Sequence, residues 1–141
     1  MKLIIKKIDK LAKGLLNHAT TGDAGLDICS NEDVVLIQNI PTKIGTGVAV
    51  ELPIDKVGLI WDKSSIGSKG IKTLGGVIDS GYRGEIFVTL INLTSENIKI
   101  DKGQKIANFI IQDYTNVEEL IETEEISDSE RGAGGFGSTG K

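Results

Sequence analysis

The fold is decided by residues 85–101, which read EIFVTLINLTSENIKID. At the end of this stretch, residues 97–101 alternate between polar and apolar side chains, which is the pattern of a β-strand with one face in water. Residues 85–93 are apolar at both parities, which predicts a strand buried on both faces, either centrally in the fold or at a subunit contact. Both segments therefore predict β-structure.

The rest of the chain repeats this pattern in short pieces. β-Branched residues dominate the apolar positions, and the runs end at Gly, Asn, Asp or Ser. The predicted strands are residues 3–8, 25–30, 34–37, 47–52, 57–61, 85–93, 97–100 and 105–114. No segment keeps a helical period beyond two turns, although residues 64–69 could form one short turn. We therefore expect an all-β fold, a jelly-roll-like sandwich or barrel of short strands.

Composition excludes several classes of protein. The chain has 141 residues, which is enough for one domain with a core. Its net charge of −4 is unlike that of proteins that bind duplex DNA by neutralising its phosphates. No apolar run approaches the roughly 20 residues of a bilayer span, and the N-terminal lysines are unlike a signal peptide. A single His and a single Cys exclude a zinc-ligand set and a Cys/His catalytic pair. We expect no nucleic-acid or membrane partner and a cytoplasmic location.

Glycine is concentrated at the C-terminal end, where residues 131–141 read RGAGGFGSTGK. Because this stretch cannot pack a core, we predict a jelly-roll domain over residues 1–126 and a mobile arm over residues 127–141. The patterns G-x-G-x-x-G and G-x-x-x-x-G-K both match, but neither has the flanking strand and helix that it requires. A plain flexible tail and a lid both fit this end, since Arg131 and the glycine amides could hold phosphate and Phe136 could stack on a base.

A second glycine-rich segment, residues 74–85, reads LGGVIDSGYRGE. Turn signals at Gly75-Gly76 and Ser80-Gly81 flank three residues, which predicts a tight hairpin with Asp79 at its tip. Asp79 is either a turn aspartate that caps its own backbone or a general base that faces a cleft. The sequence alone favours the turn aspartate.

Two further segments carry polar groups that could bind a ligand. Lys63, Ser64 and Ser65 could form a helix N-terminus that binds an anion, or the serines could simply cap the helix. Asp27 lies among apolar residues at the start of a predicted strand. It is either a solvated charge at a strand edge or a group that holds water around a hard cation.

Taken together, five segments resemble, in order and spacing, the motifs of the trimeric dUTP pyrophosphatases (dUTPases). These segments are residues 24–27 (AGLD), 63–67 (KSSIG), 76–85 (GVIDSGYRGE), 102–108 (KGQKIAN) and 131–140 (RGAGGFGSTG). The resemblance implies a homotrimer of jelly-roll subunits with sites shared between subunits. It also implies Mg²⁺-dependent hydrolysis of dUTP to dUMP and pyrophosphate by water attack on the α-phosphate. Such an enzyme limits uracil incorporation into DNA and supplies dUMP for thymidylate synthesis.

The same resemblance assigns roles around the base and sugar. Asp79 would be the catalytic residue that orients and deprotonates the attacking water. Tyr82 would pack under the deoxyribose and leave no room for a 2′-hydroxyl. The backbone around Gly76, together with Ile78, would bind the uracil edge, and Phe136 would stack on the base.

Around the phosphates, the resemblance assigns Lys63, Ser64, Ser65, Asn108, Arg131, Gly137, Ser138 and Thr139. Asp27 would hold Mg²⁺ through water. Family members usually carry Arg at the position of Lys63 and Gln at that of Asn108, and Lys lacks the planar fork of Arg. Residues 70–74 also form a shorter segment than in many bacterial members.

Two alternatives stay open. The first is dCTP deamination on the same fold, but those enzymes carry a Glu where this chain has Thr89, which cannot shuttle a proton usefully. The second is a non-enzymatic jelly-roll binding module. It explains the strands, but not why Asp79, Tyr82 and the glycine-rich end occur together.

Overall fold

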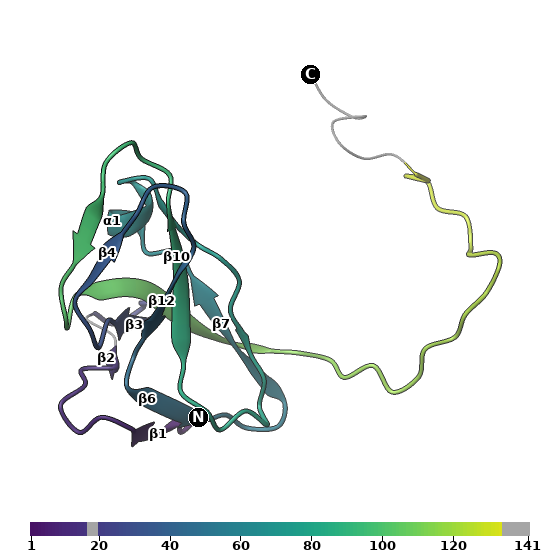
Figure 1. Ribbon diagram of the computed structural model, residues 1–141. Helices are drawn as coiled ribbons and strands as arrows, with labels where there is room; N and C mark the ends of the chain where they lie inside the picture. Colours follow the sequence, from purple (N-terminus) through teal and green to yellow (C-terminus); the bar gives the residue numbers. More distant parts are fainter. Residues whose placement is uncertain (17–19, 134–141) are drawn as a thin grey trace.

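The structure is a computed structural model that describes residues 1–16 and 20–133 (Figure 1). The elements are β1 (Ile4–Lys7), β2 (Leu15–Leu16), β3 (Leu26–Cys29), β4 (Val34–Leu36), β5 (Thr42–Gly45), β6 (Val48–Glu51), β7 (Lys56–Trp61), α1 (Ser64–Gly67), β8 (Ile71–Thr73), β9 (Val77–Ile78), β10 (Phe87–Asn92), β11 (Ile98–Ile100) and β12 (Lys105–Asp113). In the described part of the chain α1 is the only α-helix, and nothing helical there is long and apolar enough to cross a membrane.

The strands form two larger sheets and two small pairs. One sheet has the order β2-β3-β12-β7-β9 and the other has the order β5-β10-β8, while β1 pairs with β6 and β4 with β11. Each of these pairings is antiparallel, as a fold of short strands joined by turns requires. The predicted jelly-roll-like β-sandwich is confirmed, and the sheets do not close into a barrel.

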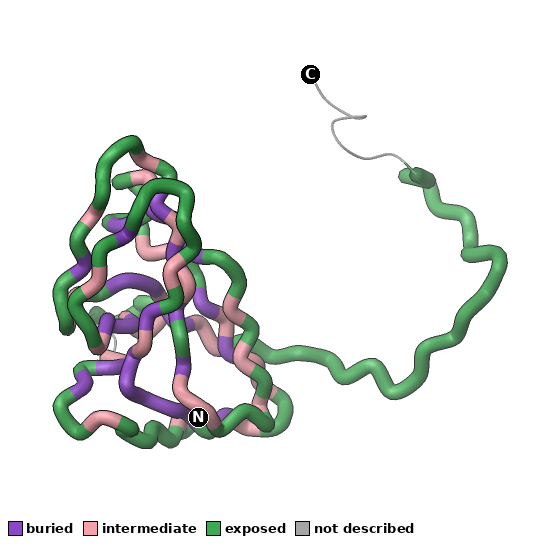
Figure 2. The backbone as a smooth tube through the Cα atoms, in the orientation of Figure 1, coloured by how far each residue is buried: buried purple, intermediate pink, exposed green. Residues whose placement is uncertain are grey.

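The core lies between the sheets (Figure 2). Ile28 and Phe109 come from the first sheet, and Ile44, Val88 and Leu90 come from the second, and none of these side chains is more than 1% exposed. Burying a side chain of this size stabilises a fold by about 1.5–3 kcal/mol relative to leaving it in water. The core therefore fixes the strands that position the site.

Strand β10 differs from the prediction. Val88 and Leu90 are fully buried, but Phe87 is 37% exposed and Ile91 is half-buried. Central burial of both faces is therefore wrong, because the second face of β10 is only partly covered within one chain. The alternative, a subunit contact, stays a prediction. The alternation over residues 97–101 is confirmed, since Lys99 is exposed and Ile100 is buried.

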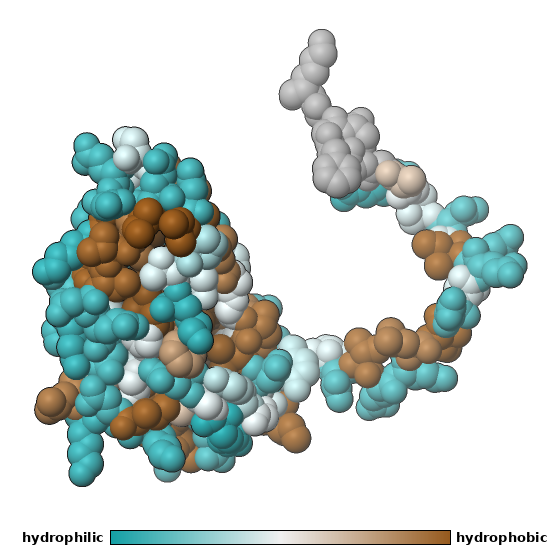
Figure 3. All heavy atoms as spheres, viewed as in Figure 1, coloured by the Kyte–Doolittle hydropathy of each residue, from teal (hydrophilic) through white to brown (hydrophobic). Residues whose placement is uncertain are grey.

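Beyond β12 the chain leaves the sandwich as an extended segment (Figure 1). Residues 112–133 are all exposed, and apolar side chains such as Leu120 and Ile126 are 90% and 89% exposed (Figure 3). The domain boundary at residue 126 stays a prediction. The mobility of the arm is also untested, and residues 134–141 lie outside the described part of the chain.

Candidate active site

Three of the predicted site residues, Asp27, Lys63 and Asn108, line one pocket. Strand β12 lies between β3 and β7, and Asn108 is the register partner of Asp27 on β3 and of Trp61 on β7. Side chains directly opposite each other in an antiparallel pair lie on the same face, so Asp27 and Asn108 are neighbours. Lys63 follows shortly after the end of β7. The phosphate-side pocket, as we call it, is lined by Asp23, Ala24, Gly25, Asp27, Lys63, Asn108 and Ile110.

Asp27 is held by two ammonium groups. Its Oδ1 accepts a hydrogen bond from Lys63 Nζ at 2.7 Å, and its Oδ2 lies 2.6 Å from Lys105 Nζ. Burial alone would raise the pKa of Asp27, but the hydrogen bonds from Lys105 and Lys63 outweigh burial and lower the pKa below its usual value. The two ammonium groups balance the charges of Asp27 and of Asp23, which also lines the pocket, so Lys63 and Lys105 are the groups there that can attract an anion.

The donors of this pocket fit a Mg²⁺ ion that arrives with a polyphosphate. Among residues 1–16 and 20–133 there is no cluster of three or more His, Cys, Asp or Glu side chains that could hold a metal. Mg²⁺ commonly binds one or two carboxylates together with phosphates and waters. Asp27 supplies one ionised carboxylate, and each of its oxygens keeps a lone pair for a water molecule.

Ser64 and Ser65 begin α1, directly after Lys63. Both are exposed, the N-cap position is Lys63, and no side-chain hydrogen bond caps the helix. The interpretation of the serines as plain helix caps is therefore wrong. Their role in phosphate binding stays a prediction, and Ile66, which is only 5% exposed, anchors the helix to the core.

Two residues that contact the lining of the phosphate-side pocket, Lys105 and Asp62, were not among the predicted site residues. Lys105 lies in a quoted segment, but its ion pair with Asp27 depends on the pairing of β12 with β3, which includes a register shift between Lys105 and Ala107. Asp62 precedes Lys63, and its Oδ1 accepts hydrogen bonds from Thr73 N at 2.8 Å and Thr73 Oγ1 at 2.7 Å. No local pattern links residues 62 and 73, so only the fold reveals this contact.

Asp62 joins the end of β7 in one sheet to β8 in the other, and its second oxygen pairs with Lys72. Partial burial alone would raise the pKa of Asp62, but hydrogen bonds from Lys72 and Thr73 outweigh it and lower the pKa below the usual 3.8. The folded pKa thus lies below the unfolded one. The stabilisation is therefore fully present above the unfolded pKa and is lost as pH falls through the folded pKa.

We expect Asp62→Asn to lower the free energy of unfolding by about 1–2 kcal/mol at pH 7. Urea unfolding of both proteins at pH 7 and pH 3 measures this, and the difference should shrink at pH 3. Asp101→Asn is the control, because it removes only a surface pair with Lys99 in which Asp101 is 64% exposed. A difference of equal size at both pH values would contradict this role of Asp62.

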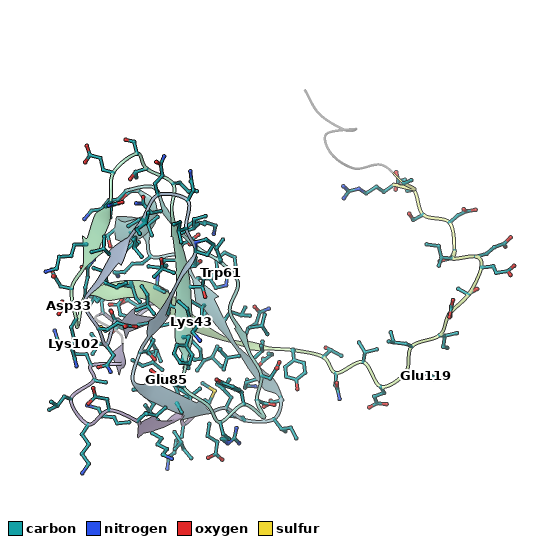
Figure 4. All side chains as sticks on the ribbon, in the orientation of Figure 1. Asp33, Lys43, Trp61, Glu85, Lys102 and Glu119 are labelled. Carbon is teal, nitrogen blue, oxygen red and sulfur yellow. The ribbon has the colours of Figure 1, made fainter. Side chains whose placement is uncertain are left out.

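A second pocket contains the other predicted group, Ile78, Asp79 and Tyr82. We call it the sugar-side pocket, and its lining residues are Val77, Ile78, Asp79, Tyr82, Glu85 and Phe87. Lys43 Nζ lies 4.4 Å from the ring centroid of Phe87. Figure 4 labels Lys43 and Glu85, which both lie on the sandwich. This cation–π contact stabilises the position of the Phe87 ring, which forms one wall of the pocket.

Asp79 opens a tight turn in which its carbonyl accepts the Tyr82 N–H at 3.0 Å. Its side chain is exposed, and among the described residues no hydrogen bond or ion pair engages the carboxylate. The interpretation of Asp79 as an aspartate that caps its own backbone is therefore wrong. The carboxylate is open to water in the pocket, as a general base must be.

The predicted hairpin over residues 75–81 is also wrong, because its two strands do not pair with each other. Strand β8 pairs with β10, whereas β9 pairs with β7. Gly75 and Gly76, with φ of 73° and 128°, carry the chain from one sheet to the other. The Gly76 carbonyl accepts the Ile60 N–H at 2.8 Å, which fixes the backbone predicted to bind uracil.

Arg131 is the one remaining predicted residue that lies on the described part of the extended segment. Arg131 is exposed near the end of the described chain, while Phe136, Gly137, Ser138 and Thr139 lie outside the described residues. Figure 4 shows the segment through Glu119, well away from the sandwich. The phosphate-side and sugar-side pockets have no lining residue in common. The predicted site residues of one chain therefore line two different pockets.

Comparison with known proteins gives consistent matches over almost the whole chain. The sequence model described as dUTPase matches residues 12–140. The deoxyuridine 5'-triphosphate nucleotidohydrolase of Nautilia profundicola is 45% identical in an alignment of 144 positions that covers 100% of both chains. A mutant dUTPase of Staphylococcus bacteriophage 80alpha, solved with dUpNHpp, has a TM-score of 0.89 and 32% identity over 99% of each chain. A mutant dUTPase from phage phi11 of S. aureus, solved with a structural Mg(II) ion, has a TM-score of 0.82 and 26% identity over 91% of this chain and 100% of its own.

Proposed function

The chain belongs to the dUTPase family and hydrolyses dUTP, and we propose that it does so at a site built jointly by copies of the chain. The observation that carries this proposal is that the two groups of residues line different pockets. Asp79 and Tyr82 line one, and Asp27, Lys63 and Asn108 line the other. A single dUTP molecule needs both groups, so the sugar-side pocket of one copy faces the phosphate-side pocket of a neighbour. A homotrimer, as in the family resemblance, satisfies this arrangement with identical sites.

In the proposed reaction, the Asp79 carboxylate takes a proton from water as the water oxygen attacks the α-phosphorus. A P–O bond forms to that oxygen, the bond from the α-phosphorus to the bridging oxygen breaks, and pyrophosphate leaves with the electron pair. The exposed Asp79 carboxylate, which no described residue engages, supports this role. Phosphoryl transfer depends mainly on such positioning and on charge neutralisation.

The phosphate-side pocket provides the neutralising charge. Lys63 and Lys105 surround Asp27, Asn108 lines the same pocket, and Ser64 follows Lys63 in the chain as a further hydrogen-bond donor. Asp27 would hold Mg²⁺ through water, and the ion when bound would withdraw charge from the phosphate oxygens. The dUpNHpp of the 80alpha enzyme supports this part of the proposal.

The residues of the C-terminal end complete the proposed site. Arg131 would bind the terminal phosphates together with Gly137, Ser138 and Thr139, while Phe136 would cover the uracil. Closure of such a segment excludes water and strengthens the interactions inside the site. A cytoplasmic location stays a prediction.

A nucleotide panel tests the reaction. The protein is incubated with Mg²⁺ and dUTP, UTP, dCTP or dTTP, and both pyrophosphate and ammonia are measured. We expect rapid pyrophosphate release from dUTP and much slower release from the other three. Ammonia from dCTP would favour the deaminase instead, and no release from any nucleotide would favour a binding module.

A further inference from the structure

The loop that carries Asp79 and Tyr82 is closed by its own hydrogen bonds. Arg83 Nη1 donates to the carbonyls of Ser80 at 2.6 Å and Tyr82 at 2.9 Å. The Tyr82 hydroxyl donates to the Glu85 carbonyl at 2.8 Å. The aromatic ring of Tyr82 therefore folds back over the backbone that follows it, and this hydrogen bond fixes where the ring lies.

Gly84 provides the space for that ring. A Cβ atom at residue 84 would lie 2.4 Å from Tyr82 Oη and 2.6 Å from Tyr82 Cζ, distances that real Cβ contacts essentially never show. The φ of Gly84 is not in the left-handed region, so its backbone conformation is open to any residue. The need for glycine at residue 84 thus comes from the Tyr82 ring and not from the turn.

The backbone beneath the ring cannot move aside to relieve such a contact. Glu85 Oε1 accepts the Gly47 N–H at 2.8 Å, which ties the loop to the turn between β5 and β6. The next residue, Ile86, is fully buried, donates from its N–H to the Val48 carbonyl at 2.9 Å, and accepts the Thr46 hydroxyl at 2.7 Å. These hydrogen bonds hold Glu85 and Ile86 in place, so the Glu85 carbonyl that accepts the Tyr82 hydroxyl is also held in place.

We propose that Gly84 is a positioning residue for sugar selection. Its lack of a side chain leaves the space in which the Tyr82 ring lies, and from that position the ring excludes a 2′-hydroxyl. This inference rests on the proposed function, in which Tyr82 packs under the deoxyribose. A methyl group at residue 84 displaces the ring, breaks its hydrogen bond to Glu85, and opens the space that a ribose hydroxyl needs. Asp79 lies outside this contact and keeps its place in the turn.

The test compares kcat/KM for dUTP and UTP in wild type, Gly84→Ala and Tyr82→Ala. We expect Gly84→Ala to raise the ratio of kcat/KM for UTP to that for dUTP by about tenfold or more. Tyr82→Ala is expected to raise the same ratio. Gly81→Ala is the control from the same loop, because a Cβ at residue 81 meets nothing within 4 Å, and its ratio should stay near that of wild type. A wild-type ratio in a folded Gly84→Ala protein, with a raised ratio in Tyr82→Ala, would overturn the proposal.

A double-mutant cycle keeps the inference testable even if Gly84→Ala lowers stability strongly. Without the ring, a methyl group at residue 84 has no clash, so Gly84→Ala should lower Tm in the wild-type background but hardly at all in the Tyr82→Ala background. An equal loss of Tm in both backgrounds would overturn the seating of Tyr82 by Gly84. This readout needs no substrate, so it separates failure of the inference from failure of the proposed function.

Discussion

Asp79→Asn is expected to reduce dUTP turnover by at least about 10²–10⁴-fold, the contribution typical of a general base. The amide has almost the same size but cannot accept the proton of the attacking water. Since no described residue engages the Asp79 carboxylate, the substitution removes no contact that stabilises the fold. We therefore expect kcat to fall by this factor, while the dissociation constant for dUTP and the Tm stay close to those of wild type.

Pyrophosphate release measures the turnover of this variant, and calorimetric titration with dUTP measures its binding. Asp128→Asn on the exposed segment is the control, because it removes the same charge away from both pockets. If Asp79→Asn turned over dUTP at a near-normal rate, Asp79 would not be the base. If it lost binding as strongly as turnover, Asp79 would act mainly as a ligand of the substrate.

Much of the fold could be predicted because long strands leave a periodic signal. Residues 105–114 were predicted as a strand and β12 spans Lys105–Asp113, and the alternation of residues 97–101 matches β11. The strands that were missed, β2, β5, β8 and β9, have only two to four residues. The three-residue strands β4 and β11 were predicted, so shortness alone does not hide a strand. The missed strands exist because a longer neighbour supplies their hydrogen bonds.

The site could be predicted as a set of residues but not as an arrangement. The segments quoted for the resemblance include Asp27, Asn108 and Asp79, but their proximity depends on strand register. Asn108 meets Asp27 only because β12 pairs with β3 after a register shift, and Lys105 reaches Asp27 across the same pair. The sequence also could not reveal that Asp79 and Asp27 line different pockets of one chain.

The Gly75-Gly76 segment shows the same limit. Its turn signal predicted a hairpin that does not form, although the positive φ angles of both residues explain why glycine is needed there. The turn signal does not say which strand receives the chain afterwards. Because β9 pairs with β7 and not with β8, the segment that carries Asp79 crosses to the other sheet. That crossing brings the segment next to β7, and the turn that starts at Asp79 places Asp79 beside Tyr82.

The proposed division of the site between copies leads to the second large expected effect. Asp79→Asn inactivates the sugar-side half, and Lys63→Ala inactivates the phosphate-side half by removing an ammonium group that would bind the triphosphate. We expect either variant alone to have at most a few per cent of wild-type activity. Mixing them in one assembly of the proposed homotrimer should restore activity, since each carries the half that the other lacks.

In a closed ring of three, any mixture of the two variants has one junction where an intact sugar-side pocket faces an intact phosphate-side pocket. Co-expressing Asp79→Asn and Lys63→Ala with different affinity tags, and purifying through both tags, yields only such mixed assemblies. Their rate of dUTP hydrolysis tests the shared site most directly. We predict about one third of the wild-type rate per trimer. Activity no higher than that of the two parent variants would contradict the account, because it would show that both halves of each site come from the same chain.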